Sequence, residues 1–401
     1  MASAATLLIV VCSVLMLVPC SVLFFEVLAA IRPCKSLHGH SAARPSVAVL
    51  IPAHNEAAVL AATLRELTPQ LTNGDRIVVV ADNCTDDTAA VARTEGAEAY
   101  ARNDTTRRGK GFALDFGVQQ LAKSPPEVVI VIDADCHTHT GTLDKLARLC
   151  AGRDCPVQSL YLMRAPIGSS VKLKIAEFAW TMRNKIRPRG LLNLGLPCHL
   201  TGSGMAFPWH QLLSVNLATG HITEDLAFGI ELARNGTPPI HCPEALVTSE
   251  FPSSVSAAAA QRTRWEHGHL ALIFSEFPGL LLLAVRRWNG GLLALALDLC
   301  VPPLALITLA SFAVWVLALL DAVALDSRTH WLLLSLAPPC LLLGALVLAW
   351  RRFARDTISL RELAGFAVYT FGKAPLYAKF MLSRQTSWVR AKRGNEPDDH
   401  G

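Results

Sequence analysis

Long apolar runs lie toward both ends of the chain, and the middle has none of comparable length. The first run extends from Ala4 to Phe25 and has no charged residue, and two others cover residues 292–320, interrupted by Asp298 and the pair Pro302 and Pro303, and residues 331–350. About 18 such residues are enough to indicate a membrane-spanning helix. The first run is long for a signal-peptide core and has no basic start, so we predict an uncleaved transmembrane anchor at residues 1–31. Two further transmembrane helices are predicted within residues 291–350.

Two weaker apolar segments predict helices that lie on the membrane surface. Residues 271–290 form one such interfacial region, and residues 363–382 form the other. The second segment contains Lys373 and Lys379, whose charges would be costly at the centre of a bilayer. Residues 351–401 are therefore predicted to be an interfacial helix followed by a basic cytoplasmic tail, and the expected number of spans is three.

The positions of the basic residues predict the orientation in the membrane. Arginines and lysines follow the first apolar run, between Arg32 and Arg44, and the third, between Arg351 and Arg355. Basic residues beside spanning helices favour the cytoplasmic side. We therefore expect a multi-pass protein of the bacterial inner (plasma) membrane, with the long segment between the first two spans and the cations of residues 384–393 in the cytoplasm.

Residues 46–270 have a different pattern, in which short apolar runs alternate with amphipathic helical segments. This alternation predicts an α/β domain with a mostly parallel, Rossmann-like sheet. The clearest strands are expected at residues 47–51, 77–81 and 128–132. Each expected strand is followed by polar residues, and open α/β sheets bind ligands at the carboxyl ends of their strands.

Two carboxylates follow the third of these strands directly. Asp133 and Asp135 leave a run of five β-branched residues, next to a dry core where an unpaired charge is unfavourable. Strand alternation would place both side chains on one side, facing a common ion or ligand. A turn or a helix cap explains the same spacing equally simply. The site interpretation gains weight from Asp82 at another strand end and from the basic, glycine-rich loop at residues 107–111.

The composition agrees with a mixed membrane and soluble protein. Of the 401 residues, 52% are hydrophobic and 17% are charged, and the mean hydropathy is +0.36. The net charge of +5 is concentrated beside the apolar runs, which favours membrane lipids as partners and gives no indication of nucleic acid. The 11 cysteines include no CxxC pair, so we expect reduced thiols.

Seven segments in a fixed order resemble family 2 glycosyltransferases, and among them the membrane-integrated synthases of cellulose, hyaluronan and poly-N-acetylglucosamine. The segments are VAVLIPAHNEAAVL, VVVADNCTDDTA, RRGKGFALDFG, VIVIDADC, TGSGMAF, ITEDLAFGIELARNG and QRTRWEHGH. They cover residues 46–269, and the most specific are the TED segment and the QxxRW segment. The resemblance implies a GT-A fold for residues 46–270.

The resemblance also implies a donor site. The residues expected to bind the nucleotide-sugar donor are Pro52, Glu56, Asp82, Lys110 and Asp133. Asp135, together with Asp133, is expected to hold Mg²⁺ or Mn²⁺ as the cofactor, since hard oxygen ligands suit these ions. The metal would neutralise the charge that develops on the leaving nucleoside diphosphate.

The catalytic residues implied by the resemblance come from its two most specific segments. They are Glu224 and Asp225 of TED, and Gln261, Arg264 and Trp265 of QxxRW. Asp225 is expected to be the general base for the acceptor hydroxyl, and Arg264 to stabilise the leaving group. Trp265 offers a flat face to an acceptor sugar, although an interfacial tryptophan would look the same. One direct displacement would invert the anomeric centre.

The expected activity is the extension of a growing polysaccharide in exopolysaccharide biosynthesis, with export subunits as candidate partners. A transferase that adds one sugar to a lipid or a lipid-linked oligosaccharide fits the same residues. A non-catalytic scaffold of an export complex is the alternative from another class. Thr201 departs from the related synthases, which commonly have cysteine at that position.

Some polar residues near these segments are not assigned to the site. His137 and His139 follow the two carboxylates, but oxygen ligands suit the expected ion better. Asp298 lies inside an apolar run and is a functional candidate by position alone. The segment from Arg187 to Pro197 suits either an amphipathic membrane contact or a surface helix packed on the sheet.

Overall fold

The structure is a computed structural model that describes residues 4–35, 43–166, 168–252, 255–325 and 330–377. Its chain forms two compact units. Within the described residues, we call residues 35–166 and 196–268 the sheet unit, and residues 4–34, 168–195 and 269–377 the helical unit. The helical unit therefore takes a segment from the middle of the chain. The predicted cations at residues 384–393 and the end of the predicted helix at 363–382 lie outside the described residues.

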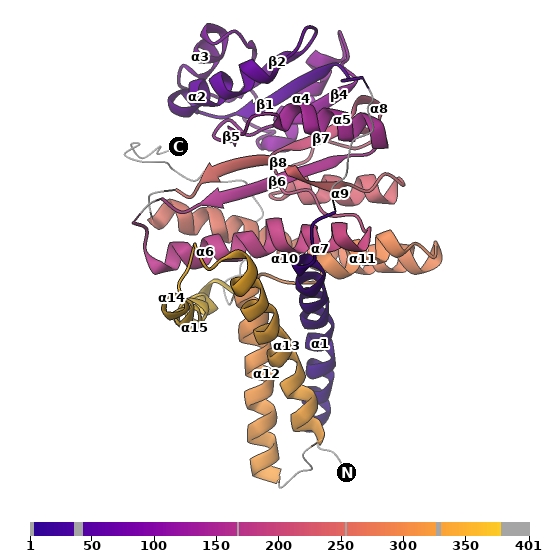
Figure 1. Cartoon of the computed structure of the whole chain (residues 1–401), viewed down its shortest axis with the longest axis vertical. Helices are drawn as coiled ribbons and strands as arrows, with labels where there is room; N and C mark the ends of the chain where they lie inside the picture. Colours follow the sequence, from indigo (N-terminus) through magenta and orange to yellow (C-terminus); the bar gives the residue numbers. More distant parts are fainter. Residues whose placement is uncertain (1–3, 36–42, 167, 253–254, 326–329, 378–401) are drawn as a thin grey trace. The chain divides into compact units, whose positions relative to one another are not determined.

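The sheet unit is built on one eight-stranded sheet, with the order β3-β2-β1-β4-β7-β6-β8-β5 (Figure 1). The strands are β1 (Val47–Ala53), β2 (Arg76–Asp82), β3 (Glu98–Arg102), β4 (Val128–Val131), β5 (His137–Thr138), β6 (Val157–Arg164), β7 (Met205–Pro208) and β8 (Ile240–Glu250). Strands β3, β2, β1 and β4 are parallel, as are β6 and β8, whereas β7 is antiparallel to both its neighbours. The predicted α/β fold with a mostly parallel sheet is confirmed, and the three strands expected from the sequence are present.

Helices connect and cover these strands. They are α2 (Ala57–Leu67), the 3-10 helix η1 (Thr68–Gln70), α3 (Thr88–Thr94), α4 (Lys110–Leu121), α5 (Thr142–Arg153), α8 (Trp209–Leu212) and α9 (Glu224–Arg234). Helix α2 buries Leu60, Leu64 and Leu67, which recur every three or four residues on one face. Helix α4 approaches β1 so closely that a Cβ at Gly117 would lie 2.4 Å from Leu50 Cδ1. Glycine at this position therefore fixes α4 against the strands that precede the polar loops.

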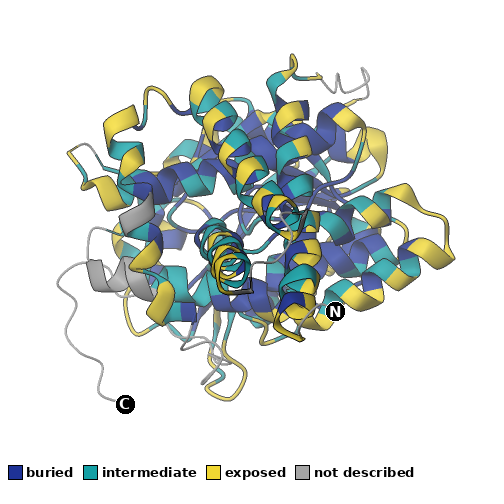
Figure 2. Ribbon diagram, turned by 90° about the horizontal axis from the view of Figure 1, so that it is seen from below, coloured by how far each residue is buried: buried dark blue, intermediate teal, exposed yellow. Residues whose placement is uncertain are grey.

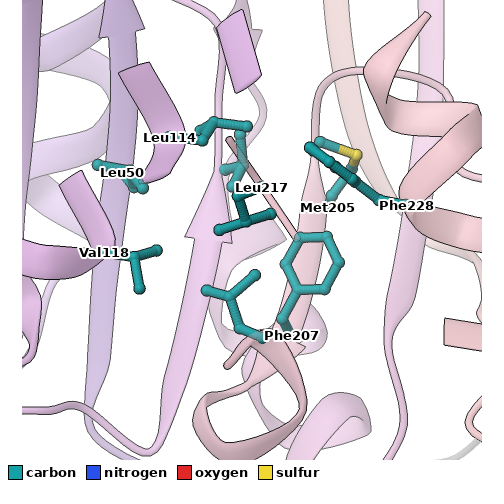
Figure 3. Close-up of a pocket in the computed structure, with 9 residues that line it drawn as sticks. Leu50, Leu114, Val118, Met205, Phe207, Leu217 and Phe228 are labelled. Atoms are coloured by element: carbon teal, nitrogen blue, oxygen red, sulfur yellow. The ribbon is translucent and has the colours of Figure 1, made fainter. Parts of the chain in front are cut away.

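A small cavity lies in the core between α4, α9 and the sheet (Figure 3). Its lining is entirely apolar and consists of Leu50, Leu114, Val118, Val131, Met205, Phe207, Leu212, Leu217 and Phe228. A ligand with phosphates and hydroxyls needs polar groups to orient it. This cavity is therefore part of the hydrophobic core, and the polar site lies elsewhere in the sheet unit.

The helical unit contains three long apolar helices that pack side by side, α1 (Ala4–Ile31), α12 (Leu304–Leu325) and α13 (His330–Phe353) (Figure 1). The remaining helices are α6 (Val171–Thr181), the π-helix η2 (Met182–Ile186), α7 (Arg187–Leu194), α11 (Gly290–Leu299), α14 (Leu360–Ala364) and α15 (Phe366–Phe371). Helix α10 (Val255–Arg286) runs from the sheet unit into the helical unit. Exposed residues gather on helices and loops, and buried residues on the strands (Figure 2).

Within the part of the chain that the structure describes, four helices are long and apolar enough to cross a membrane, at Ala4–Ile31, Gln261–Arg286, Leu304–Ala324 and Trp331–Phe353. The apolar run at residues 292–320 contains two helices, because α11 ends before Pro302 and Pro303 and α12 begins after them. The segment at residues 363–382, predicted to be an interfacial helix, contains the end of α14 and the whole of α15 in its described part, separated at Gly365. The candidate at Gln261–Arg286 includes the QxxRW segment.

An ion network is buried in the helical unit. Arg187 Nε donates to Glu26 Oε2 at 2.9 Å, and its Nη2 lies 2.5 Å from Asp298 Oδ1. All three residues are buried, so each charge depends on the others for compensation. The segment that contains Arg187 thus belongs to the helical unit and packs on α1, and Asp298 has a structural partner.

We expect Arg187→Met to lower the free energy of unfolding by about 3–5 kcal/mol, because two buried carboxylates would lose their cation. Thermal unfolding in detergent measures the change. As a matched control, Glu26→Gln with Arg187→Met and Asp298→Asn removes all three charges and should recover most of the loss. Equal destabilisation of the single and the triple variant would contradict the network's role.

Candidate functional site

The loops after β1 and β2 are held together by side chains. Asn55 Oδ1 accepts from Thr85 N at 2.7 Å, and Glu56 N donates to Thr88 Oγ1 at 2.9 Å. Asn55 has a positive φ of 54°, a conformation that asparagine tolerates better than most residues. Pro52 lies opposite Val80 in the parallel pair of β1 and β2, so it lies at the edge of the sheet where these two loops begin. Pro52 and Glu56 thus both lie at the carboxyl end of β1, and Glu56 is bonded to the segment that follows β2.

Asp82 ends β2 at this edge and is buried. Its Oδ1 accepts from Arg102 Nη1 at 2.6 Å and from Asn83 Nδ2 at 3.1 Å. Arg102 also bonds Asp104, so it links β3 to the loop before the glycine-rich segment. Arg102 belongs to none of the seven segments that carry the family resemblance, so the sequence did not predict it as a site residue. The ion pair orients the Asp82 carboxylate and leaves it a buried, charge-compensated acceptor.

Asp133 and Asp135 converge in the loop that follows β4. Oxygen atoms of both carboxylates and the sulfur of Cys136 lie within 4.8 Å of one another. The predicted convergence is present, but strand alternation does not cause it, because β4 ends at Val131 and a turn follows. In this turn Cys136 N donates to Asp133 O at 3.1 Å. The tight turn brings the two carboxylates to the same side.

Lys110 connects three parts of the site. Its Nζ lies 2.5 Å from Asp133 Oδ1 and 3.9 Å from Glu224 Oε1, and it donates to the carbonyl of Gly202 at 2.6 Å. Lys110 is the first residue of α4, directly after Gly109, whose φ of 133° suits glycine alone. Lys110, which the sequence places near the donor site, is thus paired with Asp133 in the loop that follows β4.

The charges in this cluster do not balance. Burial by itself would lower the pKa of Lys110, but the charges of Asp133 and Glu224 outweigh it and raise the pKa above its ordinary value. Burial also raises the pKa of Asp133, against the effect of Lys110. For Glu224, burial and the charge of Asp225 raise the pKa to about 7, with Lys110 opposing. One lysine therefore faces a surplus of carboxylates, which favours binding of a further cation.

The carboxylates fit a hard divalent cation better than a soft one. Asp133 and Asp135 supply oxygen atoms, which are the ligands that Mg²⁺ and Mn²⁺ prefer. Burial raises the pKa of the Cys136 thiol well above its ordinary value, so this sulfur stays protonated and is a poor ligand. His137 pairs instead with Glu66 at 2.9 Å, and His139 lies 3.5 Å from the hydroxyl of Thr248. Neither histidine joins the group of oxygen atoms that the two aspartates form.

The loop at residues 201–204 closes the site from another side. Asp133 N donates to Ser203 Oγ at 3.1 Å, so the loop holds the main chain of Asp133 as well as Lys110. Gly202 and Gly204 have φ values of 98° and 68°. A Cβ at Gly204 would lie 1.8 Å from Ser159 Oγ, and one at Gly202 would lie 3.4 Å from Asp225 Oδ2. The loop therefore lies between the carboxylates that follow β4 and Asp225.

Gln158 of β6 holds this loop by two hydrogen bonds. Its Oε1 accepts from Thr201 N at 2.8 Å, and its Nε2 donates to Ser203 O at 2.9 Å. The side chain is 1% exposed, so both bonds are shielded from water. Gln158 was not predicted as a site residue, although a glutamine in a strand of mainly apolar residues is a detectable signal.

We expect Gln158→Met to lower the turnover number about 10- to 100-fold, because the loop that holds Asp133 and Lys110 would lose two bonds. Steady-state kinetics should show a smaller change in the Michaelis constant for the donor. Gln211→Met is a matched control, since Gln211 is also buried and its Nε2 donates to a backbone carbonyl, that of Asp154. Equal loss of turnover in both variants would assign Gln158 a role in stability alone.

The TED segment begins helix α9, which brings Glu224 and Asp225 into its first turn. Helix α10 packs directly on this turn, because a Cβ at Gly268 would lie 2.6 Å from Thr223 Cγ2. Gln261, Arg264 and Trp265 precede Gly268 by seven, four and three residues, so they follow one face of α10. Each is partly buried. The TED segment and the segment that contains QxxRW, which are far apart in the sequence, thus meet at the start of α9.

Comparison with known proteins identifies one family. Residues 45–268 match the family described as "Glycosyltransferase like family 2". An uncharacterised glycosyltransferase of Mycobacterium tuberculosis H37Rv is 32% identical over 206 residues, which is 46% of this chain and 85% of that protein. A probable glycosyltransferase of Bacillus subtilis, YdaM, is 37% identical over 100 residues, which is 23% of each chain.

A solved structure with a similar fold extends over most of the chain. The mannosyltransferase PcManGT of Pyrobaculum calidifontis, solved with GDP-Man and Mn²⁺, has a TM-score of 0.53 and 18% identity. The match covers 86% of this chain and 98% of that one. At this level of identity the likeness concerns the fold alone.

Proposed function

This chain belongs to the glycosyltransferase family 2-like proteins and is a glycosyltransferase, and we propose that it transfers a sugar from a nucleotide-sugar donor, with inversion, to a growing saccharide. One observation carries this proposal. An acidic cluster with one lysine lies at the carboxyl ends of the strands. Its members are Lys110, Asp133, Asp135, Glu224 and Asp225. Such a surplus of carboxylates suits a site that binds a metal and a diphosphate and removes a proton.

We assign the donor to the edge formed by β1, β2 and β4. Pro52, Glu56 and Asp82 would contact the nucleoside, and Asp133 and Asp135 would hold Mn²⁺ or Mg²⁺ near the diphosphate. The fold relative from Pyrobaculum calidifontis was solved with GDP-Man and Mn²⁺, which supports this assignment. A bound divalent cation supplies charge stabilisation to the diphosphate leaving group. Lys110, already paired with Asp133, would add a second positive charge there.

Asp225 is the proposed general base. The loop at Gly202 lies against its Oδ2, and α9 holds its backbone, so the carboxylate is positioned before the acceptor arrives. Removal of the acceptor proton on one face of the sugar and departure of the diphosphate on the other would invert the anomeric centre. Glu224 lies in the same turn as Asp225, and burial raises its pKa to about 7; it would position Lys110 of α4.

The face of α10 that packs on the TED turn would complete the acceptor side. Arg264 would stabilise negative charge on the leaving group, and Trp265 would offer a flat surface to an acceptor sugar. Gln261 Oε1 is buried and has no hydrogen-bond partner among the described residues, so it can accept a hydrogen bond from a substrate hydroxyl. These assignments rest on the shared helix face and on the proximity of Gly268 to Thr223.

We further propose that α1, α12 and α13 cross the membrane and that the sheet unit faces the cytoplasm. The basic residues after α1 and at the end of α13 support this orientation. Membrane lipids, a saccharide or lipid-linked acceptor and, in an exopolysaccharide pathway, export subunits are the proposed partners. Three spanning helices form a small membrane portion, so addition of a single sugar remains the second candidate.

A panel of nucleotide sugars tests the proposal. Purified full-length protein in lipid is incubated with each donor, an oligosaccharide or lipid acceptor and Mn²⁺, and released nucleotide is measured together with the product. A ladder of product lengths from one donor supports chain extension, and a single product supports one addition. Failure to bind or cleave any donor with either metal would favour a scaffold and overturn the proposed activity.

A further inference from the structure

The first turn of α4 lies against residues 217–222, the stretch of chain that leads into the TED helix α9. A Cβ at Gly111 would lie 2.6 Å from two carbonyl oxygens of this stretch, so the main chain there leaves no room for a side chain. A Cβ at Gly220 would lie 3.8 Å from Phe112 Cε2, which is an ordinary van der Waals distance. Two successive residues of α4 thus contact the chain just before the TED segment.

Residues 217–222 have few other attachments. Among the residues that the structure describes, no hydrogen bond joins them to any part of the chain except the preceding Asn216. Leu217 is buried in the core, whereas Gly220 and His221 are exposed. The position of the main chain at Gly220, and of the turn that follows it, therefore depends on packing against α4 more than on hydrogen bonds.

Phe112 lies outside the core cluster that the rest of α4 helps to form. The next two residues, Ala113 and Leu114, are buried in that cluster, whereas Phe112 is partly exposed and does not belong to it. Its ring faces Arg102, whose Cζ lies 5.7 Å from the ring centroid. This distance is within the range of an attractive contact between a guanidinium and an aromatic face. The ring therefore contacts Arg102 as well as the main chain at Gly220.

The guanidinium that supports this ring is itself fixed. Arg102 lies 2.6 Å from Asp82 Oδ1 and 3.1 Å from Asp104 Oδ2, and its side chain is 10% exposed. Two ion pairs hold a planar guanidinium in one orientation. A continuous series of contacts thus leads from the nucleoside side of the site to the TED turn. Its members are Asp82, Arg102, Phe112 and Gly220.

We propose that Phe112 is a positioning residue that holds the turn of Asp225 in register with the Asp82–Arg102 ion pair. The ring acts through the main chain at Gly220, five residues before Asp225, and touches neither substrate. A catalytic group must be held within about 0.5 Å of its productive position, so a small shift of this turn lowers the rate. The inference rests on the proposed function, in which Asp82 contacts the nucleoside and Asp225 is the base.

Electron paramagnetic resonance tests the contact without any donor. A nitroxide is attached to p-acetylphenylalanine introduced at the exposed position of His221, in the full-length protein in lipid nanodiscs, so that the native cysteines stay unlabelled. Phe112→Leu should raise the mobile fraction of the label about 2- to 5-fold, because the attraction to the guanidinium is lost. Phe112→Tyr keeps the ring and should give the wild-type spectrum.

Phe116→Leu is the matched control, because Phe116 lies on the same helix and packs against the core. The control should leave the label as immobile as in the wild type. A label that is equally immobile in Phe112→Leu and in the wild type would overturn the proposal. Equal mobilisation by Phe116→Leu would overturn it as well, since general loosening of α4 would then explain the effect.

Arg102→Met tests the other half of the link. It should mobilise the label in the wild-type background and add little in the Phe112→Leu background, since the ring transmits the effect. Fully additive effects would mean that Arg102 reaches residues 217–222 by another route, and the proposed series of contacts would be wrong.

Steady-state kinetics then connect the contact with catalysis. With a donor that the wild type accepts, Phe112→Leu should lower the turnover number about 10-fold and change the Michaelis constant for the donor less than about 2-fold. Phe112→Tyr should keep the wild-type turnover number. Unchanged turnover together with a mobile label would refute the positioning role. If the wild type turned over no donor, the proposed function would fail, and the label would still show whether Phe112 holds the TED turn.

Discussion

Asp225→Asn should abolish sugar transfer while leaving the protein folded and able to bind its donor. A positioned general base contributes about 10²–10⁴-fold to a rate, so we expect the turnover number to fall by about 10³-fold. The asparagine keeps the size of the side chain and the neighbouring loop at Gly202, but it cannot accept the acceptor's proton. Transfer is measured with the donor that the wild type accepts, and donor binding by calorimetry in the presence of Mn²⁺.

Glu231→Gln is the control for this variant, because Glu231 lies on the same helix and its Oε1 accepts from Asn216 N at 3.2 Å. The control should keep wild-type turnover. Turnover of Asp225→Asn close to that of the wild type would refute the assigned base. Loss of both transfer and donor binding would instead mean that Asp225 acts on the donor, and the base would have to be sought elsewhere in the cluster.

Asp135→Asn should weaken metal binding at least about 100-fold, by the loss of a charged oxygen ligand. Asp133 and Lys110 remain paired in this variant, so the loop and the start of α4 should stay in place. The expected result is a much higher Mn²⁺ concentration for half-maximal activity and a lower maximal rate. Mn²⁺ affinity is measured directly by electron paramagnetic resonance, without any donor.

His137→Gln tests whether His137 binds the metal or only lies near the two aspartates in the sequence. His137 follows the two aspartates in sequence, but its ring pairs with Glu66 on α2. We expect this variant to bind Mn²⁺ as the wild type does. If His137→Gln weakened metal binding as much as Asp135→Asn, oxygen ligands alone would not define the site, and the choice of Mn²⁺ or Mg²⁺ would be in doubt.

The apolar patterns predicted those helices and strands whose signal lies in residues that are neighbours along the chain. The charge-free apolar run from Ala4 to Phe25 predicts a long helix, and β-branched residues before Asp133 predict a buried strand, because both signals come from neighbours along the chain. Pro302 and Pro303 interrupt the apolar run at residues 292–320 in the sequence. Proline breaks a helix in most contexts, and the structure shows two helices there.

The candidate site was predicted in part for the same reason. Asp82, Asp133 and Asp135 follow strands, and parallel strands bring their carboxyl ends to one edge, so topology alone predicts their proximity. Arg102 and Gln158 were missed, because their partners are far away in sequence. Arg102 reaches Asp82 over 20 residues, and Gln158 reaches Ser203 over 45. No local pattern records which distant backbone group a buried side chain bonds.

The sequence by itself determined the alternation of strands and helices, the apolar helices and the supply of carboxylates at strand ends, since each depends on side-chain periodicity or on the chemistry of single residues. Only the tertiary structure decided that Lys110 pairs with Asp133, that Gln158 holds the loop beside Asp225, and that α10 packs on the TED turn. These arrangements depend on distances between segments far apart along the chain. Such distances are set by packing and by the satisfaction of buried charges, which periodicity does not encode.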